Sequence, residues 1–384
     1  MGRIFFTRQN NYNQTEIDEA IAKSFSHFGG VQNFINKGDK VLLKVNLVSG
    51  HPVFHRVTTD PSIVRAVAKL VLDAGGIPFI ADSPGIDNFA NSAEKAGFMS
   101  IARELDIECR ELTEPVNLPV NDDASYKKIQ VSKFVLEADK IINLPKLKTH
   151  GQMYLTMGVK NLFGCIPGRL KAGWHYNVGL NRERFAGLLL DIYGGVKPTF
   201  TILDGVIGMH GDGPTSGEPY NFGIICSCVD ALTMDFWLCK MLGAKLEDYP
   251  LYLAAKQRNL PQCELDEADV EGEISPSHVF PNVKIPKTRS MKLIPIPFIE
   301  RLMTSKPVHI PELCIGCGRC AAVCAAGALK HENKRLSFNY SKCIRCYCCH
   351  EMCPVKAIKF KESWLLKLVN FFTGYSSSSS ASSG

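Results

Sequence analysis

Residues 1–260 alternate between short apolar runs and longer segments in which apolar side chains recur at helical spacing. One helix is predicted at residues 16–28, and another begins after Asp60 and Pro61, which suit the capping and first positions of a helix. Strand–helix–strand units of this kind predict parallel pairing with a right-handed crossover. The sequence therefore predicts an α/β fold whose mostly parallel or mixed sheet is flanked by helices. Buried strands are predicted at residues 3–6, 40–45, 77–81, 140–143, 200–203 and 222–228.

The alternation weakens after residue 260. Frequent prolines predict an irregular extension and a linker over residues 261–305. A cysteine-rich segment, residues 306–361, is predicted to be a separate small α+β domain. The remaining residues, 362–384, are predicted to form a short apolar helix and a disordered Ser-rich end.

Composition narrows the possible functions. Hydrophobic residues make up 45% of the chain and charged residues 21%, which is enough apolar material for a buried core. The net charge of +6 is not gathered into Lys/Arg blocks, which argues against nucleic-acid binding but is compatible with a pocket for a small anion. No secretory signal and no run of about 18 apolar residues is present, so we expect a reducing, cytoplasmic location.

Nine of the fifteen cysteines lie between residues 314 and 353. Eight of them form two C-x₂-C-x₂-C-x₃-C runs, and each cysteine of the first run recurs 29 residues later. Three thiolates at this spacing wrap one corner of a 4Fe–4S cluster, whereas the fourth reaches the other cluster. The predicted ligands of cluster one are therefore Cys314, Cys317, Cys320 and Cys353. The predicted ligands of cluster two are Cys343, Cys346, Cys349 and Cys324.

The cysteine runs resemble the bacterial two-cluster ferredoxins. One departure is Ala325, which stands where a proline usually follows the fourth cysteine. Cys348 is an alternative ligand to Cys349, although the spacing favours Cys349. Two structural zinc ions are the other alternative, and zinc sites typically use paired C-x₂-C motifs rather than triple spacing.

Basic and amide side chains follow several predicted strands. Their position at strand ends suits a crevice that binds a carboxylate or a phosphate, although each lysine alone is compatible with a solvated basic face. A glycine-rich loop at residues 211–217 lacks the Walker A and dinucleotide patterns; it either brings backbone N–H groups to an anion or is a plain mobile loop. The predicted substrate-binding residues are Lys44, Asn46, Lys146, Lys148, Asn161, Asp82 and Asp204. The predicted catalytic residues are His150, His175 and Lys160.

Three further candidates have simpler interpretations. His175 is either a proton donor or an ordinary packing residue, and Asp230 is most simply the N-cap of a helix. Cys165 ends a loop-like stretch and is either a core thiol or a residue near the pocket.

Seven stretches between residues 40 and 245 form a recognisable set. They include INLPKLKTH at residues 142–150 and GVKNLFG at residues 158–164. The others are residues 42–48, 59–61, 81–85, 203–205 and 211–217. Through these stretches, residues 40–245 resemble the family called domain of unknown function 362. Members often carry a two-cluster ferredoxin at the C-terminus, so the resemblance implies an iron–sulfur protein but supplies no substrate.

The sequence thus predicts an iron–sulfur oxidoreductase. Electrons are expected to pass through two 4Fe–4S clusters to or from a small anionic substrate bound in a basic pocket of the α/β domain. The alternative is a non-catalytic electron-transfer or assembly protein whose α/β domain docks a redox partner protein. The apolar helix predicted at residues 363–373 suits contact with a membrane surface, although packing on the protein is favoured.

Overall fold

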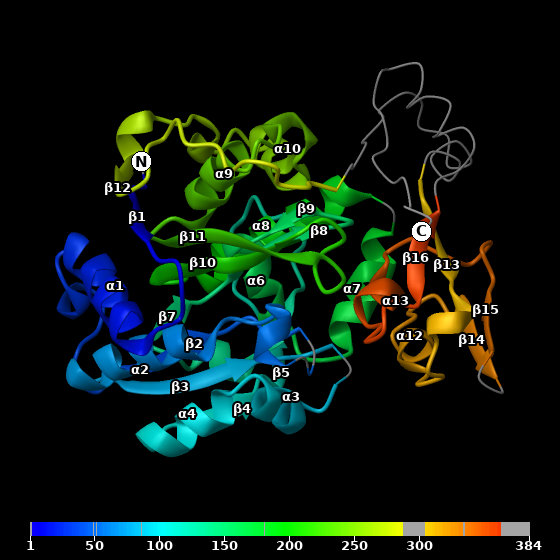
Figure 1. Cartoon of the computed structure of the whole chain (residues 1–384), viewed down its shortest axis with the longest axis horizontal. Coiled ribbons are helices and arrows are strands. Elements are labelled where there is room, and N and C mark those ends of the chain that lie inside the picture. Colours follow the sequence, from blue (N-terminus) through cyan, green and yellow to red (C-terminus); the bar gives the residue numbers. More distant parts are fainter. Residues whose placement is uncertain are drawn as a thin grey trace. The chain divides into compact units, whose positions relative to one another are not determined.

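The computed structural model describes residues 2–48, 50, 52–85, 87–179, 181–286, 304–332 and 335–361. They belong to two compact units, Met1–Thr288 and Arg289–Gly384 (Figure 1). Most of the predicted linker, together with the predicted C-terminal helix and Ser-rich end, lies outside the described residues.

A mixed sheet forms the centre of the first unit. Its strands are β1 (Ile4–Arg8), β2 (Lys40–Lys44), β3 (Ile77–Asp82), β4 (Glu108–Glu111), β7 (Lys140–Asn143), β8 (Lys146–His150), β9 (Tyr154–Thr156), β10 (Phe200–His210), β11 (Glu218–Cys228) and β12 (Val270–Gly272). Eight of these follow the order β12-β1-β11-β10-β7-β2-β3-β4, with β12 at the top edge and β4 at the bottom edge in Figure 1. The five strands from β10 to β4 run parallel, whereas β11 is antiparallel to its neighbours. This confirms the predicted α/β class.

Helix starts follow the capping residues in the sequence. Asn13 caps α1 (Gln14–His27), and Asp60 caps α2 (Pro61–Asp73) by accepting a hydrogen bond from the Ser62 N–H. Asp230 caps α9 (Ala231–Met241), as predicted. The other helices of the first unit are α3 (Phe89–Lys95), α4 (Phe98–Leu105), α5 (Lys133–Leu136), α6 (Gly158–Asn161), α7 (Leu170–Val178), α8 (Arg182–Val196) and α10 (Pro250–Gln257). A separate two-stranded pair joins β5 (Pro115–Asn117) to β6 (Gln130–Ser132).

Both faces of the sheet are buried, which explains why its central strands are continuous apolar runs. Along β2, Val41 and Leu43 belong to one core cluster and Leu42 to the other, because successive side chains point to opposite faces. The first cluster is completed by side chains of α1 to α4, and the second by side chains of α6 to α10. The core therefore consists of two apolar layers with the sheet between them.

The chain order creates a switch point between β2 and β7. After β2 the chain continues to β3 and β4 on one side of β2, whereas β7 and β10 lie on its other side. In open α/β sheets, ligands bind beyond the carboxyl ends of the strands at such a point. This edge carries the residues that the sequence singles out.

The segment after residue 260 adds to the first unit. It was expected to be an irregular extension, yet β12 pairs in parallel with β1. Phe280 is buried against the core, and Lys284 forms an ion pair with Glu218 at 2.7 Å. These contacts tie the described residues 261–286 to the sheet.

The second unit is built from short elements. The antiparallel pairs are β13 (Lys306–His309) with β16 (Ile358–Lys361), and β14 (Leu329–Glu332) with β15 (Arg335–Phe338). Each cysteine run contains one short helix, α12 (Arg319–Ala322) or α13 (Cys348–Glu351). The small α+β organisation matches the prediction for residues 306–361.

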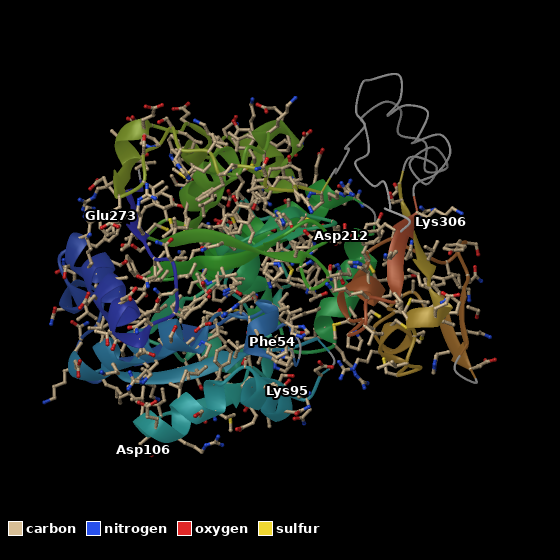
Figure 2. All side chains as sticks on the ribbon, viewed as in Figure 1. Phe54, Lys95, Asp106, Asp212, Glu273 and Lys306 are labelled. Atoms are coloured by element: carbon tan, nitrogen blue, oxygen red, sulfur yellow. The ribbon has the colours of Figure 1, made fainter. Side chains whose placement is uncertain are left out.

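Phe200 allows a test of the core. Its ring is fully buried and lies 4.7 Å from the ring of Phe34 and 4.9 Å from that of Phe25, measured between centroids. Phe200→Ala is expected to lower the free energy of unfolding by about 3–5 kcal/mol, because it leaves a cavity. Phe54, labelled in Figure 2, is 70% exposed, so Phe54→Ala is the matched control. Equal effects in denaturant titrations would contradict this packing.

Candidate functional site

A buried ion pair joins the carboxyl ends of β2 and β3. The Lys44 Nζ lies 2.8 Å from the Asp82 Oδ1, and both side chains are almost wholly inaccessible. Asp82 also accepts the Leu47 N–H at 2.6 Å, and Lys44 donates to the Val45 carbonyl at 2.7 Å. The structure therefore brings together two predicted substrate-binding residues, Lys44 and Asp82. Their opposite charges neutralise each other within the protein.

A second buried pair joins Lys146, at the start of β8, to Asp204 in the middle of β10. The Lys146 Nζ is 2.6 Å from the Asp204 Oδ2 and 2.8 Å from the Tyr12 hydroxyl, which donates to the Asp204 Oδ1 at 2.9 Å. The Asp60 N–H donates to the same carboxylate at 2.9 Å. Burial lowers the pKa of Lys146, against the opposing charge of Asp204. Burial and the charge of Asp204 raise the pKa of Tyr12, which keeps the hydroxyl protonated.

Amide side chains span the switch point. The Lys148 Nζ donates to the Asn46 Oδ1 at 2.7 Å, and the Asn46 Nδ2 donates to the Asn161 Oδ1 at 3.0 Å. The Asn161 Nδ2 then donates to the Asn143 Oδ1 at 2.9 Å. Because Asn46 follows β2 and Asn143 ends β7, this chain ties α6 to both strands and positions Lys160 beside their carboxyl ends.

His150 lies among cations. Its Nδ1 accepts the N–H groups of Gln152 and Met153, each at 3.1 Å, so the proton of the neutral ring is on Nε2. Burial and the charge of Lys160 lower the pKa of His150 well below its usual value, and Arg182 acts in the same direction. The uncharged ring is thus a hydrogen-bond donor in a positive environment.

His175 shares this environment. Burial lowers its pKa to about 3, with further contributions from the charges of Lys160 and Lys171. The ring packs against Phe163 and Phe185, with centroid separations of 5.5 and 4.8 Å. It is therefore neutral at neutral pH, and its packing matches the simpler sequence interpretation. Lys148, His150, Lys160, His175 and Arg182 together are called the cationic centre below.

Sequence reasoning missed several members of this region. Tyr12 lies in no motif and at no predicted strand end, and the sequence identifies Asp60 only as a helix cap. Arg182 and Lys171 do not follow a predicted strand, which is the pattern that identified most of the other basic candidates. Lys171 donates to the Ser83 carbonyl at 2.6 Å, and burial lowers its pKa to about 7.

The remaining candidates take structural positions. A Cβ at Gly213 would lie 2.1 Å from the Thr149 carbonyl oxygen, so the glycine-rich loop packs closely against the backbone of β8. Cys165 is fully buried, and burial raises the pKa of its thiol to about 12. Asp230 accepts hydrogen bonds from the first turn of α9.

In the second unit, one small pocket is lined by five cysteines. Cys324 comes from the first run and Cys343, Cys346 and Cys349 from the second, and this is the set predicted for cluster two. Apolar side chains, including Leu329, Phe338 and Tyr347, complete the lining. The donors fit a cluster bound by thiolates in an apolar shell.

The fourth cysteine of each run lies near the other run. Burial raises the pKa of Cys320 to about 11, and the charges of Cys353 and Cys317 add to this effect, which places Cys353 beside the first run. The Cys324 sulfur accepts the Ala328 N–H at 3.2 Å, and the Cys353 sulfur accepts the Ala357 N–H at 3.1 Å. Both halves therefore position the fourth thiol in the same way.

Cys348 also lines the cavity, but its thiol has another partner. A hydrogen bond from the Cys348 side chain lowers the pKa of Cys346, and the Cys348 Sγ lies 3.9 Å from the Cys346 carbonyl oxygen. The thiol is thus a neighbour of a predicted ligand.

The chain belongs to the family described as Domain of unknown function (DUF362), which it matches over residues 41–240. Residues 306–354 match the 4Fe-4S dicluster domain. These matches confirm the resemblance inferred from the motifs and identify the C-terminal segment as an iron–sulfur domain of the 4Fe–4S type with a role in electron transfer.

Relatives cover the chain to different extents. A thylakoid-associated protein of Synechocystis sp. is 35% identical over 311 residues, which is 80% of this chain and 94% of that protein. An uncharacterized ferredoxin of Methanocaldococcus jannaschii is 44% identical over 54 residues, or 13% of this chain and 70% of that ferredoxin. A solved protein structure from Thermotoga maritima has a TM-score of 0.35 at 12% identity, and the match covers 57% of this chain and 56% of that one. Within the described residues, no helix combines the length and apolarity needed to cross a membrane.

Gly164 tests the Lys44–Asp82 pair. A Cβ at this position would lie 2.2 Å from the Asp82 Oδ1 and 2.6 Å from the Lys44 Nζ, so Gly164→Ala must displace a buried ion pair. We expect a loss of about 1–3 kcal/mol in the free energy of unfolding. Gly173 in α7 has nothing within 4 Å of such a Cβ, so Gly173→Ala should be neutral or stabilising by up to about 1 kcal/mol. Indistinguishable thermal unfolding of the two variants would refute this role.

Proposed function

We propose that the chain passes electrons through two 4Fe–4S clusters, to or from a small anionic substrate bound by the α/β unit. The observation that carries the proposal is the spacing of the eight repeated cysteines, together with the position of Cys353 near the first run and of Cys324 near the second. Cluster one is held by Cys314, Cys317, Cys320 and Cys353. Cluster two is held by Cys343, Cys346, Cys349 and Cys324.

The protein provides the hydrogen bonds and the solvent exposure at each proposed cluster site. A bound 4Fe–4S cluster supplies one-electron redox chemistry, and its potential depends on hydrogen bonds to sulfur and on exposure. The Ala328 and Ala357 N–H groups donate to one thiolate in each set, which favours the anionic form of that ligand. Cys317 is exposed, whereas Cys349 is buried, so the two clusters occupy different environments.

The cationic centre is the favoured position for the anion. Lys44 and Lys146, predicted from the sequence as direct ligands, already face Asp82 and Asp204 at ion-pair distance and support the strand ends. Lys160 is the half-buried residue of α6, the helix that the amide chain holds beside the switch point. Its ammonium group and the neutral imidazoles of His150 and His175 combine positive charge with N–H donors, which suits a carboxylate or phosphate.

The cluster assignment is tested by anaerobic purification with iron counting and EPR. About eight irons per chain are expected, and Cys353→Ser should perturb the signal of cluster one while leaving cluster two intact. Cys348→Ser is the matched control and should retain all eight irons. About four irons in the parent protein, or equal losses in both variants, would contradict the two ligand sets.

The anion site is tested by calorimetric titration of the holo-protein with inorganic phosphate and with oxalate. Lys160→Gln is expected to weaken binding of the preferred anion about tenfold or more, because a charge-assisted hydrogen bond is lost. Lys128 is exposed elsewhere on the same unit, and Lys128→Gln should bind like the parent. The alternative is that the α/β unit docks a redox partner protein. It replaces the anion proposal if neither anion binds and the full-length Lys160→Gln variant fails to retain a redox protein that the parent retains in a pull-down.

A further inference from the structure

The positive charge of the chain is concentrated in one small segment. Residues 306–361 contain ten Lys and Arg residues but three Glu residues and no Asp, a side-chain balance of +7 that the negative charge of two thiolate-bound clusters reduces. The whole chain carries +6, so everything outside this segment is close to neutral. Proteins with such an asymmetric charge attract partners of opposite sign and speed their association.

Three of these lysines share one face of a two-stranded sheet. In the antiparallel pair of β13 and β16, Lys306 lies opposite Lys361, and Val308 lies opposite Lys359. Residues directly opposite each other project to the same side, as do residues two apart along a strand. Lys306, Lys359 and Lys361 therefore form a lysine face, and Figure 2 labels Lys306 at its place on β13.

The opposite face of this sheet points toward the cavity of cluster two. Pro307, which lies opposite Phe360, lines the cavity. The Phe360 ring lies 4.7 Å from the Tyr347 ring and 4.3 Å from the His350 ring, measured between centroids. Tyr347 and His350 flank Cys349, a proposed cluster ligand, so the lysine face is separated from cluster two by one layer of sheet.

The lysine face is uncompensated among the described residues. Like charges placed directly opposite each other across two strands are destabilising, and no described acid forms an ion pair with any of the three ammonium groups. Lys359 and Lys361 are exposed, and the Lys306 ammonium lies 4.8 Å from the centre of the Tyr340 ring. An acidic partner surface would relieve this repulsion.

We propose that the lysine face is the docking surface for an acidic redox protein that exchanges electrons with cluster two. This rests on the proposed function, because it requires cluster two to be present and reducible. An anionic membrane is the less suitable occupant, since interfacial binding uses large apolar side chains and Val308, half-buried, is the apolar residue of this face.

The test measures electron transfer from dithionite-reduced, full-length holo-protein to a purified acidic flavodoxin by stopped flow. The second-order rate constant of the parent should fall as salt rises. Lys359→Gln/Lys361→Gln should lower it about tenfold at low salt and flatten the salt dependence. Lys95→Gln/Lys128→Gln makes the same change at exposed lysines of the α/β unit and should match the parent.

Iron content and EPR of every variant separate this inference from the proposed function. Failure of the parent to bind or reduce its clusters overturns the proposed function and the docking inference that rests on it. If the clusters are intact in Lys359→Gln/Lys361→Gln but its rate and salt dependence equal those of the control, the docking inference alone is overturned. Should the double variant lose its clusters, Lys361→Gln at the end of β16 is used, with an intermediate loss of rate expected.

Binding of the lysine face to an anionic membrane is tested by sedimentation with lipid vesicles that contain phosphatidylserine. The lysine variant and the parent should sediment with them equally. If instead the lysine variant loses vesicle binding while its transfer to flavodoxin is unchanged, the face binds membranes and the proposal is overturned.

Discussion

Two buried lysine–aspartate pairs are the constraint on which the carboxyl edge of the sheet depends. An ammonium group without water needs a carboxylate and further hydrogen bonds, and removal of one partner from such a pair typically costs about 3–5 kcal/mol. Lys44 with Asp82 joins β2 to β3, and Lys146 with Asp204 joins the β7–β8 segment to β10. The ends of β2 and β3 and the β7–β8 segment are held in place because each buried ammonium group needs its carboxylate.

The lysines of those pairs are separate from the basic side chains of the cationic centre. The amide chain from Asn46 through Asn161 to Asn143 places α6 at the switch point, and α6 carries Lys160. Burial keeps His150 and His175 neutral, so they add donors without adding repulsion. The same packing thus separates the lysines of the two ion pairs from Lys160.

The second unit is built around two similar cysteine runs. Each short cysteine run contains one helix, and its fourth cysteine, just beyond that helix, lies near the other run. The apolar shell around Cys349 and the exposure of Cys317 make the halves unequal despite their repeat. The outer face of β13 and β16 then places positive charge close to the enclosed half.

The sequence by itself determined the α/β class, the helix caps Asp60 and Asp230, and the cysteine repeat, because each depends on spacing along the chain. It also indicated that polar residues at strand ends would meet, since parallel strands end at a common edge. Which lysines are neutralised was decided by the tertiary structure: Asp82 and Asp204 are distant in sequence from Lys44 and Lys146, and they become partners only when the strands pair. Tyr12, Gly164 and Arg182 joined the site for the same reason, because their roles arise from contacts that no local pattern records.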